Sequence, residues 1–458
     1  MARPPAASEV RIDLVRIVDL LLDHLSPALC LAAFRRVRRS ERQRKWTLHA
    51  LVRFWTAVIL RAPQALSQAL SEALAGREPL FPRVDATPEA FFQRCRDLRP
   101  EFFAEVFRDF TGRMVAAVPP RYAAEVAAVR VRFAGGIVLI DGSRLAAIAR
   151  RLKILWDERA VILPGCLLGL YDLGWGLCRA LYFSADAAAS EMTRAKGALK
   201  DLGADTLVVG DRLYGTADFF AALAAHQCWG LVRRRRQLTL RKLERRRKCR
   251  YAGGLLEEWL VRAGTGVTAP AQTLRYIRWR RGGTRHEILT NVLSRERLRA
   301  EEALALYPYR WRIERMYFDL KEVLNLNRFY AANPNAVAMQ VYAAAIVYNA
   351  LRVAQSEAGA AGGVEPEEIS PAKFYPRVAA ACFMYVQMLE HERRLRQRPG
   401  RSHFRLIPRS HTWRSASLSE ICRERRSPHR RKRRYCPARG RWKSFAKVRG
   451  ARYLLGLT

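Results

Sequence analysis

Residues 307–324, YPYRWRIERMYFDLKEVL, carry charged and phenolic side chains at regular intervals in a segment that is otherwise apolar and aromatic. Steps of three, four and seven positions lead from Tyr307 to Arg310, Glu314 and Lys321. Because an α-helix turns by about 100° per residue, these four side chains fall in one stripe roughly 60° wide. Arg310 and Glu314 alone could form an ordinary helix ion pair, but that pairing leaves Lys321 unexplained. The stripe therefore predicts a helix that presents an acid between two cations.

Two aspartates each end a short apolar run that predicts a buried strand: Asp141 in IVLIDGS and Asp211 in LVVGDRLYG. Catalytic groups of α/β sheets gather at the carboxyl edges of strands, so these acids could meet Glu314 there. A single aspartate in such a place is more often a turn or cap residue. Three converging carboxylates, in contrast, can hold two divalent metals about 4 Å apart, an arrangement that promotes in-line phosphoryl transfer. Magnesium prefers this oxygen-only coordination.

The elements that must position these residues change in type along the chain. Residues 1–125 show apolar residues at helical spacing, separated by proline-containing turns. From about residue 131 the patterns follow the order strand, strand, strand, helix, strand, helix, and Glu191 lies in the first turn of the first of these helices. This order predicts a mixed α/β sheet with three antiparallel strands and further parallel ones. Residues 228–293 alternate apolar with polar or basic side chains and predict a β-rich insertion into it.

The charge of the chain points to a polyanionic partner. Lys and Arg total 82 against 42 Asp and Glu, which gives a net charge of +40 and a pI near 11.0. Such an excess attracts nucleic acid and, more weakly, acidic membranes. A basic structural protein without enzymatic activity would share this composition. The Arg-rich sequence after about residue 400 predicts a basic extension.

Cysteine usage and apolar segments exclude several other classes. None of the nine cysteines forms a C-x-x-C pair, which argues against a structural zinc site and fits a reducing cytosol. Asp13, Asp19 and Asp23 interrupt the apolar residues near the N-terminus, so this segment predicts an amphipathic helix and not a signal peptide. The longest apolar stretch, residues 339–354, contains Gln, Asn and Arg and predicts a core helix and not a membrane span.

The spacing Tyr307-x2-Arg310-x3-Glu314-x6-Lys321 resembles the Y-x2-R-x3-E-x6-K signature of DDE transposases of insertion-sequence family four. IDGSRL and GDRLYG resemble the motifs around the first and second aspartates of that family, and the resemblance covers roughly residues 130–355. It implies a ribonuclease-H-like catalytic domain with a β-rich insertion between the second aspartate and the glutamate. The predicted β-rich segment lies in that gap.

The resemblance also implies roles for the site residues. Asp141, Asp211 and Glu314 would be catalytic and bind the metals, two Mg²⁺ ions that Mn²⁺ can replace. Tyr307, Arg310 and Lys321 would hold DNA phosphates, with Tyr307 at a helix N-cap because Pro308 follows it.

Relatives that carry the insertion use one of its tryptophans to accept a flipped base. Trp229, Trp259 and Trp279 are the candidates here, although a packed sheet tryptophan is the simpler interpretation of each. The sequence leaves open which of them, if any, takes this role.

The expected organisation is α/β, with three parts. Residues 1–125 form a helical DNA-binding region, residues 126–358 a ribonuclease-H-like transposase catalytic domain, and residues 359–458 a helical and basic C-terminal region. The resemblance implies a cytoplasmic DNA transposase that acts on double-stranded DNA, forms a homodimer in its DNA complex and uses no membrane. It would bind the terminal inverted repeats of its element, cleave the DNA and join the 3′ ends to target DNA. Alternatives are a DDE-type nuclease without strand transfer and an inactive, domesticated DNA-binding protein.

Overall fold

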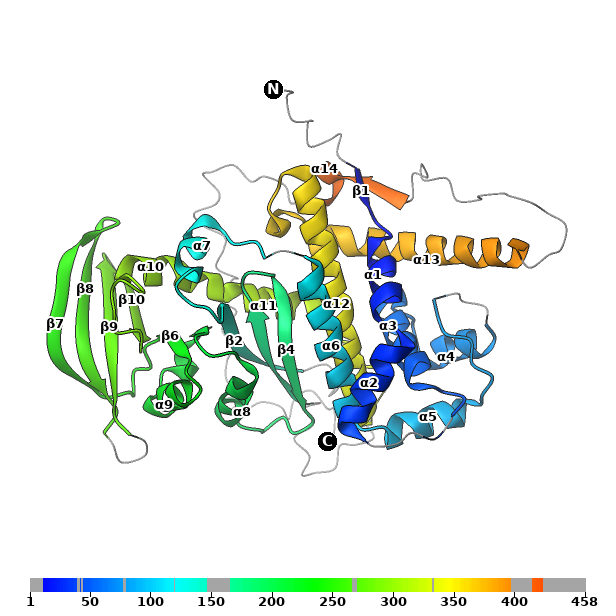
Figure 1. Cartoon of the computed structure of the whole chain (residues 1–458), viewed down its shortest axis with the longest axis horizontal. Helices are drawn as coiled ribbons and strands as arrows, with labels where there is room; N and C mark the ends of the chain where they lie inside the picture. Colours follow the sequence, from blue (N-terminus) through cyan, green and yellow to red (C-terminus); the bar gives the residue numbers. More distant parts are fainter. Residues whose placement is uncertain are drawn as a thin grey trace, which may run out of the picture.

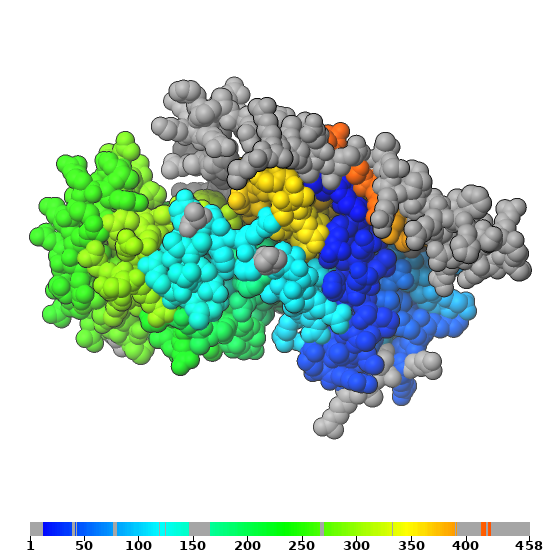
Figure 2. Space-filling model, turned by 45° about the horizontal axis from the view of Figure 1, so that its top comes forward, coloured from blue at the N-terminus to red at the C-terminus, as the bar shows by residue number. Residues whose placement is uncertain are grey.

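The computed structural model describes residues 11–38, 42, 44–76, 80–118, 120–145, 165–265, 270–331, 333–396 and 414–422. The N-terminal helices (blue) lie at one end of the molecule and a run of long strands (green) at the other (Figure 1), and the same two colours mark opposite ends of the space-filling view (Figure 2). A mixed sheet crossed by one long helix connects the two ends.

Helices fill most of the described chain that precedes the sheet. Ser26, Thr47 and Thr87 each cap a helix by accepting a hydrogen bond from the backbone N–H three residues later. The helices are α1 (Arg16–His24), α2 (Pro27–Val37), α3 (Leu48–Arg61), α4 (Leu66–Leu74), α5 (Pro88–Asp97), α6 (Glu101–Ala117) and α7 (Ala124–Arg130).

One strand in this region departs from the helical expectation. β1 (Arg11–Asp13) pairs antiparallel with β11 (Ser415–Ser417), about 400 residues further along the chain. No local pattern in so short a segment encodes such a pairing, because a strand of this length gains its order only from its distant partner.

The main sheet has nine strands in the order β4-β3-β2-β5-β6-β10-β9-β8-β7. β2 pairs antiparallel with β3 and parallel with β5, and β5 pairs parallel with β6. The mixed arrangement expected from the sequence is therefore present. The strands are β2 (Ile137–Arg144), β3 (Cys166–Asp172), β4 (Leu177–Ser184), β5 (Leu207–Gly210), β6 (Trp229–Arg233), β7 (Leu240–Tyr251), β8 (Gly254–Ala263), β9 (Gln272–Arg281) and β10 (Thr284–Thr290).

The β-rich segment continues this sheet. β10 pairs antiparallel with β6, so β7 to β10 extend the sheet beyond β6. Arg275, which is fully buried, pairs with Glu258 at 2.9 Å and donates to the backbone oxygens of Val292, Ser294 and Leu298. These bonds fasten the extension to the chain that leads into the helix of Glu314.

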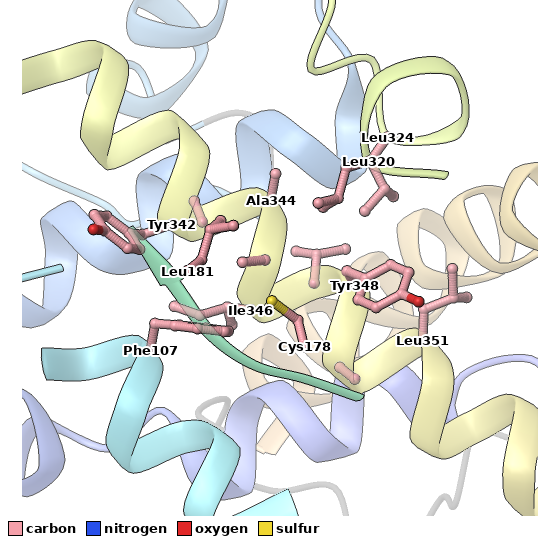
Figure 3. Close-up of a cluster of buried hydrophobic side chains, with 14 of the residues drawn as sticks. Phe107, Cys178, Leu181, Leu320, Leu324, Tyr342, Ala344, Ile346, Tyr348 and Leu351 are labelled. Atoms are coloured by element: carbon pink, nitrogen blue, oxygen red, sulfur yellow. The ribbon is translucent and has the colours of Figure 1, made fainter. Parts of the chain in front are cut away.

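The helix α12 (Pro334–Gly362) is the centre of the core. It packs against β4 and α6, and side chains from all three meet in Figure 3. Asn349 accepts from the Cys178 N–H and donates to Cys178 O and Thr111 Oγ1, which ties α12 to both neighbours. By length and composition α12 could span a membrane, and so could α1 and α2 as one bent pair, but the apolar window of α12 is completely buried. In this fold α12 is a buried core helix, as the sequence predicts.

The other helical elements join or cover these parts. They are α8 (Glu191–Ala198), η3 (Leu199–Asp201), η4 (Arg212–Tyr214), α9 (Ala217–Ala225), α10 (Ala300–Leu306), η5 (Tyr307–Arg310), α11 (Trp311–Phe318), η6 (Asp319–Val323), η7 (Pro366–Glu368), α13 (Pro371–Arg396) and α14 (Leu418–Ile421).

Candidate active site

Asp141 and Asp211 each lie two residues beyond the last pair between the parallel strands β2 and β5. Ile137 pairs with Leu207 and Leu139 with Val209, so partners differ by 70 in residue number, as the two aspartates do. Residues in register on neighbouring strands lie about 5 Å apart and project to the same face. The sheet therefore brings the two acids together at one edge of its parallel part.

The surroundings of the two aspartates differ. Asp211 follows the last residue of β5 and caps η4, accepting from the Leu213 N–H at 2.6 Å. Asp141 follows the apolar part of β2, but the strand continues to Arg144 because β3 still pairs with it there. The expectation that both acids end a strand is thus right for Asp211 and wrong for Asp141. The alternative interpretation of Asp211 as a cap residue is also correct, and the hydrogen bond from the Leu213 N–H holds its carboxylate in place.

Arg310 connects Glu314 with Asp141. Its Nη1 lies 2.5 Å from Glu314 Oε1 and 3.9 Å from Asp141 Oδ2. The residue is only 8% exposed, and its buried Nε has no hydrogen-bond partner among the described residues. The predicted ion pair between Arg310 and Glu314 is present, and the same guanidinium also approaches Asp141 on the sheet. Helix and sheet acids therefore share one cation.

The stripe of residues 307–321 does not lie on one regular α-helix. Tyr307 is the C-cap of α10 and the first residue of the 3-10 turn η5, and not the helix N-cap expected from Pro308. A 3-10 turn accommodates the proline at its start. The α-helix α11 follows and then widens into the π-helical turn η6. The side chain of Tyr307 is buried near Arg310 and Asp211. Burial raises the pKa of Tyr307 to about 12; the charge of Arg310 opposes the rise and the charge of Asp211 adds to it.

Lys321 lies in the π-helical turn and contacts the end of β2. Its Nζ donates to Ser143 Oγ at 2.7 Å and to the Arg144 carbonyl at 2.8 Å. Burial lowers the pKa of this ammonium. Lys321 thus reaches the strand that carries Asp141, two to three residues beyond the acid, and its charge lies near the site without an ion pair to Glu314.

The site concentrates negative charge. Burial raises the pKa of Asp141 to about 7; Arg310 opposes the rise, and the charges of Asp211, Glu191 and Glu314 add to it. A carboxyl that titrates near neutrality among other acids is typical of a functional site that takes up a cation.

Glu191 and Tyr317 lie near these acids but were not predicted from the sequence to belong to the site. Glu191, which starts α8 after the Ser190 cap, accepts a hydrogen bond from the buried Tyr214 hydroxyl at 2.7 Å. Burial raises the pKa of Glu191 and Tyr214 opposes the rise. Tyr317 donates its hydroxyl to the Asp141 carbonyl at 2.8 Å. The only sequence signal for Glu191 was its place in a helix first turn, which ordinary helix capping explains equally well.

The donor set suits a hard divalent cation such as Mg²⁺, because it offers only carboxylate oxygens in a part-buried place with surplus negative charge. The side chains are nevertheless not gathered around one point. In the described ranges, no group of three or more His, Cys, Asp or Glu residues is arranged to hold a metal ion. Arg310 instead lies against Glu314 and near Asp141, so a metal would compete with an internal cation.

Each of the three candidate tryptophans contacts a neighbouring side chain or backbone group. The Trp229 Nε1–H donates to Asp205 and the Trp279 Nε1–H to the Tyr251 carbonyl. Trp259 is 6% exposed and stacks on Tyr276. These contacts fit the packed-tryptophan interpretation. Trp311, three residues before Glu314, is by contrast half exposed and lies under the Arg310 guanidinium.

Comparisons with known proteins add an independent observation. Residues 169–350 match the family described as "Transposase DDE domain", a range that includes Asp211, Tyr307, Arg310, Glu314 and Lys321 but begins after Asp141. A curated protein of Sinorhizobium fredii (strain NBRC 101917 / NGR234), named "Putative transposase y4zB", is 31% identical over 150 residues, which are 31% of this chain and 41% of that protein.

A solved structure also aligns along most of the chain. The cryo-EM structure of the piggyBac transposase synaptic complex with hairpin DNA aligns with 88% of this chain and 90% of its own, at 11% identity and a TM-score of 0.39. The present chain matches 41% of the S. fredii protein, which is less than half of that protein's length. The family match and this relative support a DDE transposase.

Proposed function

We propose that this protein is a DNA transposase of insertion-sequence family four, which binds the terminal inverted repeats of its element, cleaves DNA and joins the 3′ ends to target DNA. The observation that supports the proposal most directly is the position of Arg310, which contacts Glu314 on the helix and lies near Asp141 on the sheet. Asp141 lies on β2 two residues after its last pair with β5, Asp211 directly follows β5, and Arg310 links Glu314 to Asp141 from the neighbouring helix. The ribonuclease-H-like assignment agrees with the order of β4, β3, β2, β5 and β6.

The three acids are proposed to hold two Mg²⁺ ions, with Mn²⁺ able to replace them. Bound metal would stabilise the attacking and leaving oxygens of an in-line phosphoryl displacement. The chain's own residues prepare that step. Asp211 is oriented by the Leu213 N–H, and Asp141 by the Gly142 N–H at 3.0 Å. Arg310 would turn its guanidinium from the acids to a DNA phosphate, for which its unpaired Nε offers a donor.

The charge of the protein supports double-stranded DNA as the partner. A net charge of +40 favours phosphate binding without sequence preference. The edge strand β7 carries exposed arginines along one end of the sheet. We further propose a homodimer on DNA, because two element ends must be cut together, and a cytoplasmic location in a bacterium.

The decisive experiment incubates the purified protein with a plasmid that carries the element ends, in Mg²⁺. We expect nicking at the ends, followed by joining of 3′ ends to a second plasmid. Glu314→Gln should abolish both reactions and retain end binding. Glu322→Gln, an exposed acid two turns further along, is the matched control and should behave as the parent.

The outcome separates the three functions. Nicking without joined products would identify a nuclease. Equal nicking by the parent and Glu314→Gln would overturn the assignment of this site, and end binding without any cleavage in Mg²⁺ or Mn²⁺ would leave a DNA-binding protein.

A further inference from the structure

Glu191 meets Asp141 at the backbone of Gly142. The Gly142 N–H donates to Asp141 Oδ1 at 3.0 Å, and it lies close enough to the Glu191 carboxylate to oppose the rise of its pKa. A Cβ at position 142 would lie 2.2 Å from the carboxylate carbon and Oε2 of Glu191, which is closer than real atoms approach. The absence of a side chain at Gly142 is therefore what admits the Glu191 carboxylate beside Asp141.

Tyr214 holds Glu191 in this position. The tyrosine is fully buried, and its hydroxyl donates to Glu191 Oε1 at 2.7 Å. Tyr214 belongs to the 3-10 turn that Asp211 caps, so the residue that orients Glu191 is three positions from the second aspartate. Glu191 itself opens α8, which Ser190 already caps by accepting from the Thr193 N–H. Capping this helix does not require the Glu191 carboxylate, which is free for another role.

Arg310, which contacts Glu314 and lies 3.9 Å from Asp141, carries an unsatisfied donor beside these acids. Arg310 is more than nine-tenths buried, its Nη1 contacts Glu314, and its Nε has no partner among the described residues. A buried guanidinium nitrogen without an acceptor is costly, and an incoming anionic oxygen would satisfy it. The site is thus built for a ligand that brings anionic oxygen, as a metal-bound phosphate does.

We propose that Glu191 is a fourth carboxylate of the metal site and binds a divalent cation together with Asp141 and Asp211. The cation would lie on the side of these acids that faces Tyr214. The inference rests on the proposed function, because it adds a ligand to the site that the function requires. Four acids instead of three give the site one more negative charge and a second oxygen ligand beside Asp141. Tyr214 is the positioning residue that directs Glu191 to this place.

Mn²⁺ binding to the full-length protein, measured from the decrease of the free Mn²⁺ signal in electron paramagnetic resonance, tests the proposal without any cleavage assay. Glu191→Gln should weaken Mn²⁺ binding by at least tenfold, and Glu191→Asp should restore part of it. Gly142→Ala, which displaces the carboxylate, should resemble Glu191→Gln. Tyr214→Phe keeps the buried ring and should weaken binding less. Glu89→Gln, an exposed acid in the first turn of α5, is the matched control and should bind as the parent.

The outcomes separate this inference from the function on which it rests. Parent-like Mn²⁺ affinity in Glu191→Gln, with weakened affinity in Asp141→Asn, would overturn the fourth ligand alone. Parent-like affinity in both variants would overturn the metal site as a whole. Circular dichroism and end binding in EDTA identify any variant that fails to fold, and Glu191→Asp, the smallest change, then decides.

Discussion

The Tyr317 hydroxyl donates to the backbone carbonyl of Asp141 at 2.8 Å, three residues after Glu314 in the same helix. This bond joins the helix of the third acid to the strand of the first. A Cβ at Gly169, on β3, would lie 2.7 Å from the same hydroxyl. The Tyr317 hydroxyl therefore fits against the sheet only because residue 169 is a glycine. The distance between the two acids therefore depends on a contact that involves neither of their carboxylates.

Removal of this hydroxyl should loosen the helix from the sheet. Tyr317→Phe keeps the buried ring and loses one hydrogen bond, so the free energy of unfolding should fall by about 1 kcal/mol. Urea unfolding measures this loss. Cleavage of element ends should fall more than the stability change explains, because the position of Glu314 relative to Asp141 is no longer fixed. Tyr309→Phe, which loses an exposed bond to Glu125 at 3.2 Å, is the control. Equal cleavage by both variants would contradict the positioning role.

The high pKa of Asp141 predicts how stability depends on pH without metal. As the pH rises, the unfolded chain releases this proton near the ordinary value of 3.8, whereas the folded protein keeps it until about 7. The unfolded state binds fewer protons in that window, so the contribution of Asp141 to the free energy of unfolding falls between pH 4 and 7 and then levels off. Asp141→Asn should lack this contribution. Urea unfolding of both proteins in EDTA across this range measures the difference, and a constant difference would be incompatible with the raised pKa.

Removal of Arg310 should affect metal and DNA in opposite ways. Two unit charges at 4 Å interact with about 4 kcal/mol at an effective dielectric constant of 20, and about 1.4 kcal/mol corresponds to a tenfold change in affinity, so loss of this cation should tighten Mn²⁺ binding by about tenfold or more. Arg310→Ala should nevertheless slow cleavage by about 100-fold or more, because a charged donor to the phosphate is missing. Arg310→Lys should recover little, since an ammonium does not replace a bidentate guanidinium. Weaker Mn²⁺ binding in Arg310→Ala would show that the arginine does not compete with metal.

The C-terminal sequence should contribute mainly to nonspecific affinity. Residues 423–458 contain 14 Lys or Arg and one Glu. Each phosphate contact adds about 0.9 to the slope of log K against log salt, so a protein that ends at Cys422 should have a shallower slope and an unchanged preference for element ends. Titrations of end and random DNA at several salt concentrations measure both. If the slope remains that of the full chain, these basic residues do not contact DNA.

The sequence predicted those parts of the fold and site that depend on local pattern. The apolar runs before Asp141 and Asp211 predicted their strands, and the spacing from Tyr307 to Lys321 predicted a helical segment. The 3-10 turn at Tyr307 and the π-helical turn at Lys321 were missed, because hydrophobic periodicity does not resolve such changes of pitch.

Long-range contacts account for the other differences. The pairing of β1 with β11 joins opposite ends of the described chain, and the continuation of β2 past Asp141 requires its partner β3. Glu191 was not assigned to the site because an acid in a helix first turn is common. Its proximity to Asp141 depends on Gly142, a residue in another element, and no spacing in the sequence connects the two.

The most direct test of the account asks whether Asp141, Asp211 and Glu314 surround one metal. Fe²⁺ bound in place of Mg²⁺, with ascorbate and peroxide, cuts the polypeptide within a few ångströms of the ion, and mass spectrometry locates the cuts. The account predicts cuts near residues 141, 211 and 314 in the parent, all lost together in Asp211→Asn and all suppressed by excess Mg²⁺. Cuts near only one of these residues, or cuts that persist in Asp211→Asn, would contradict a shared metal site.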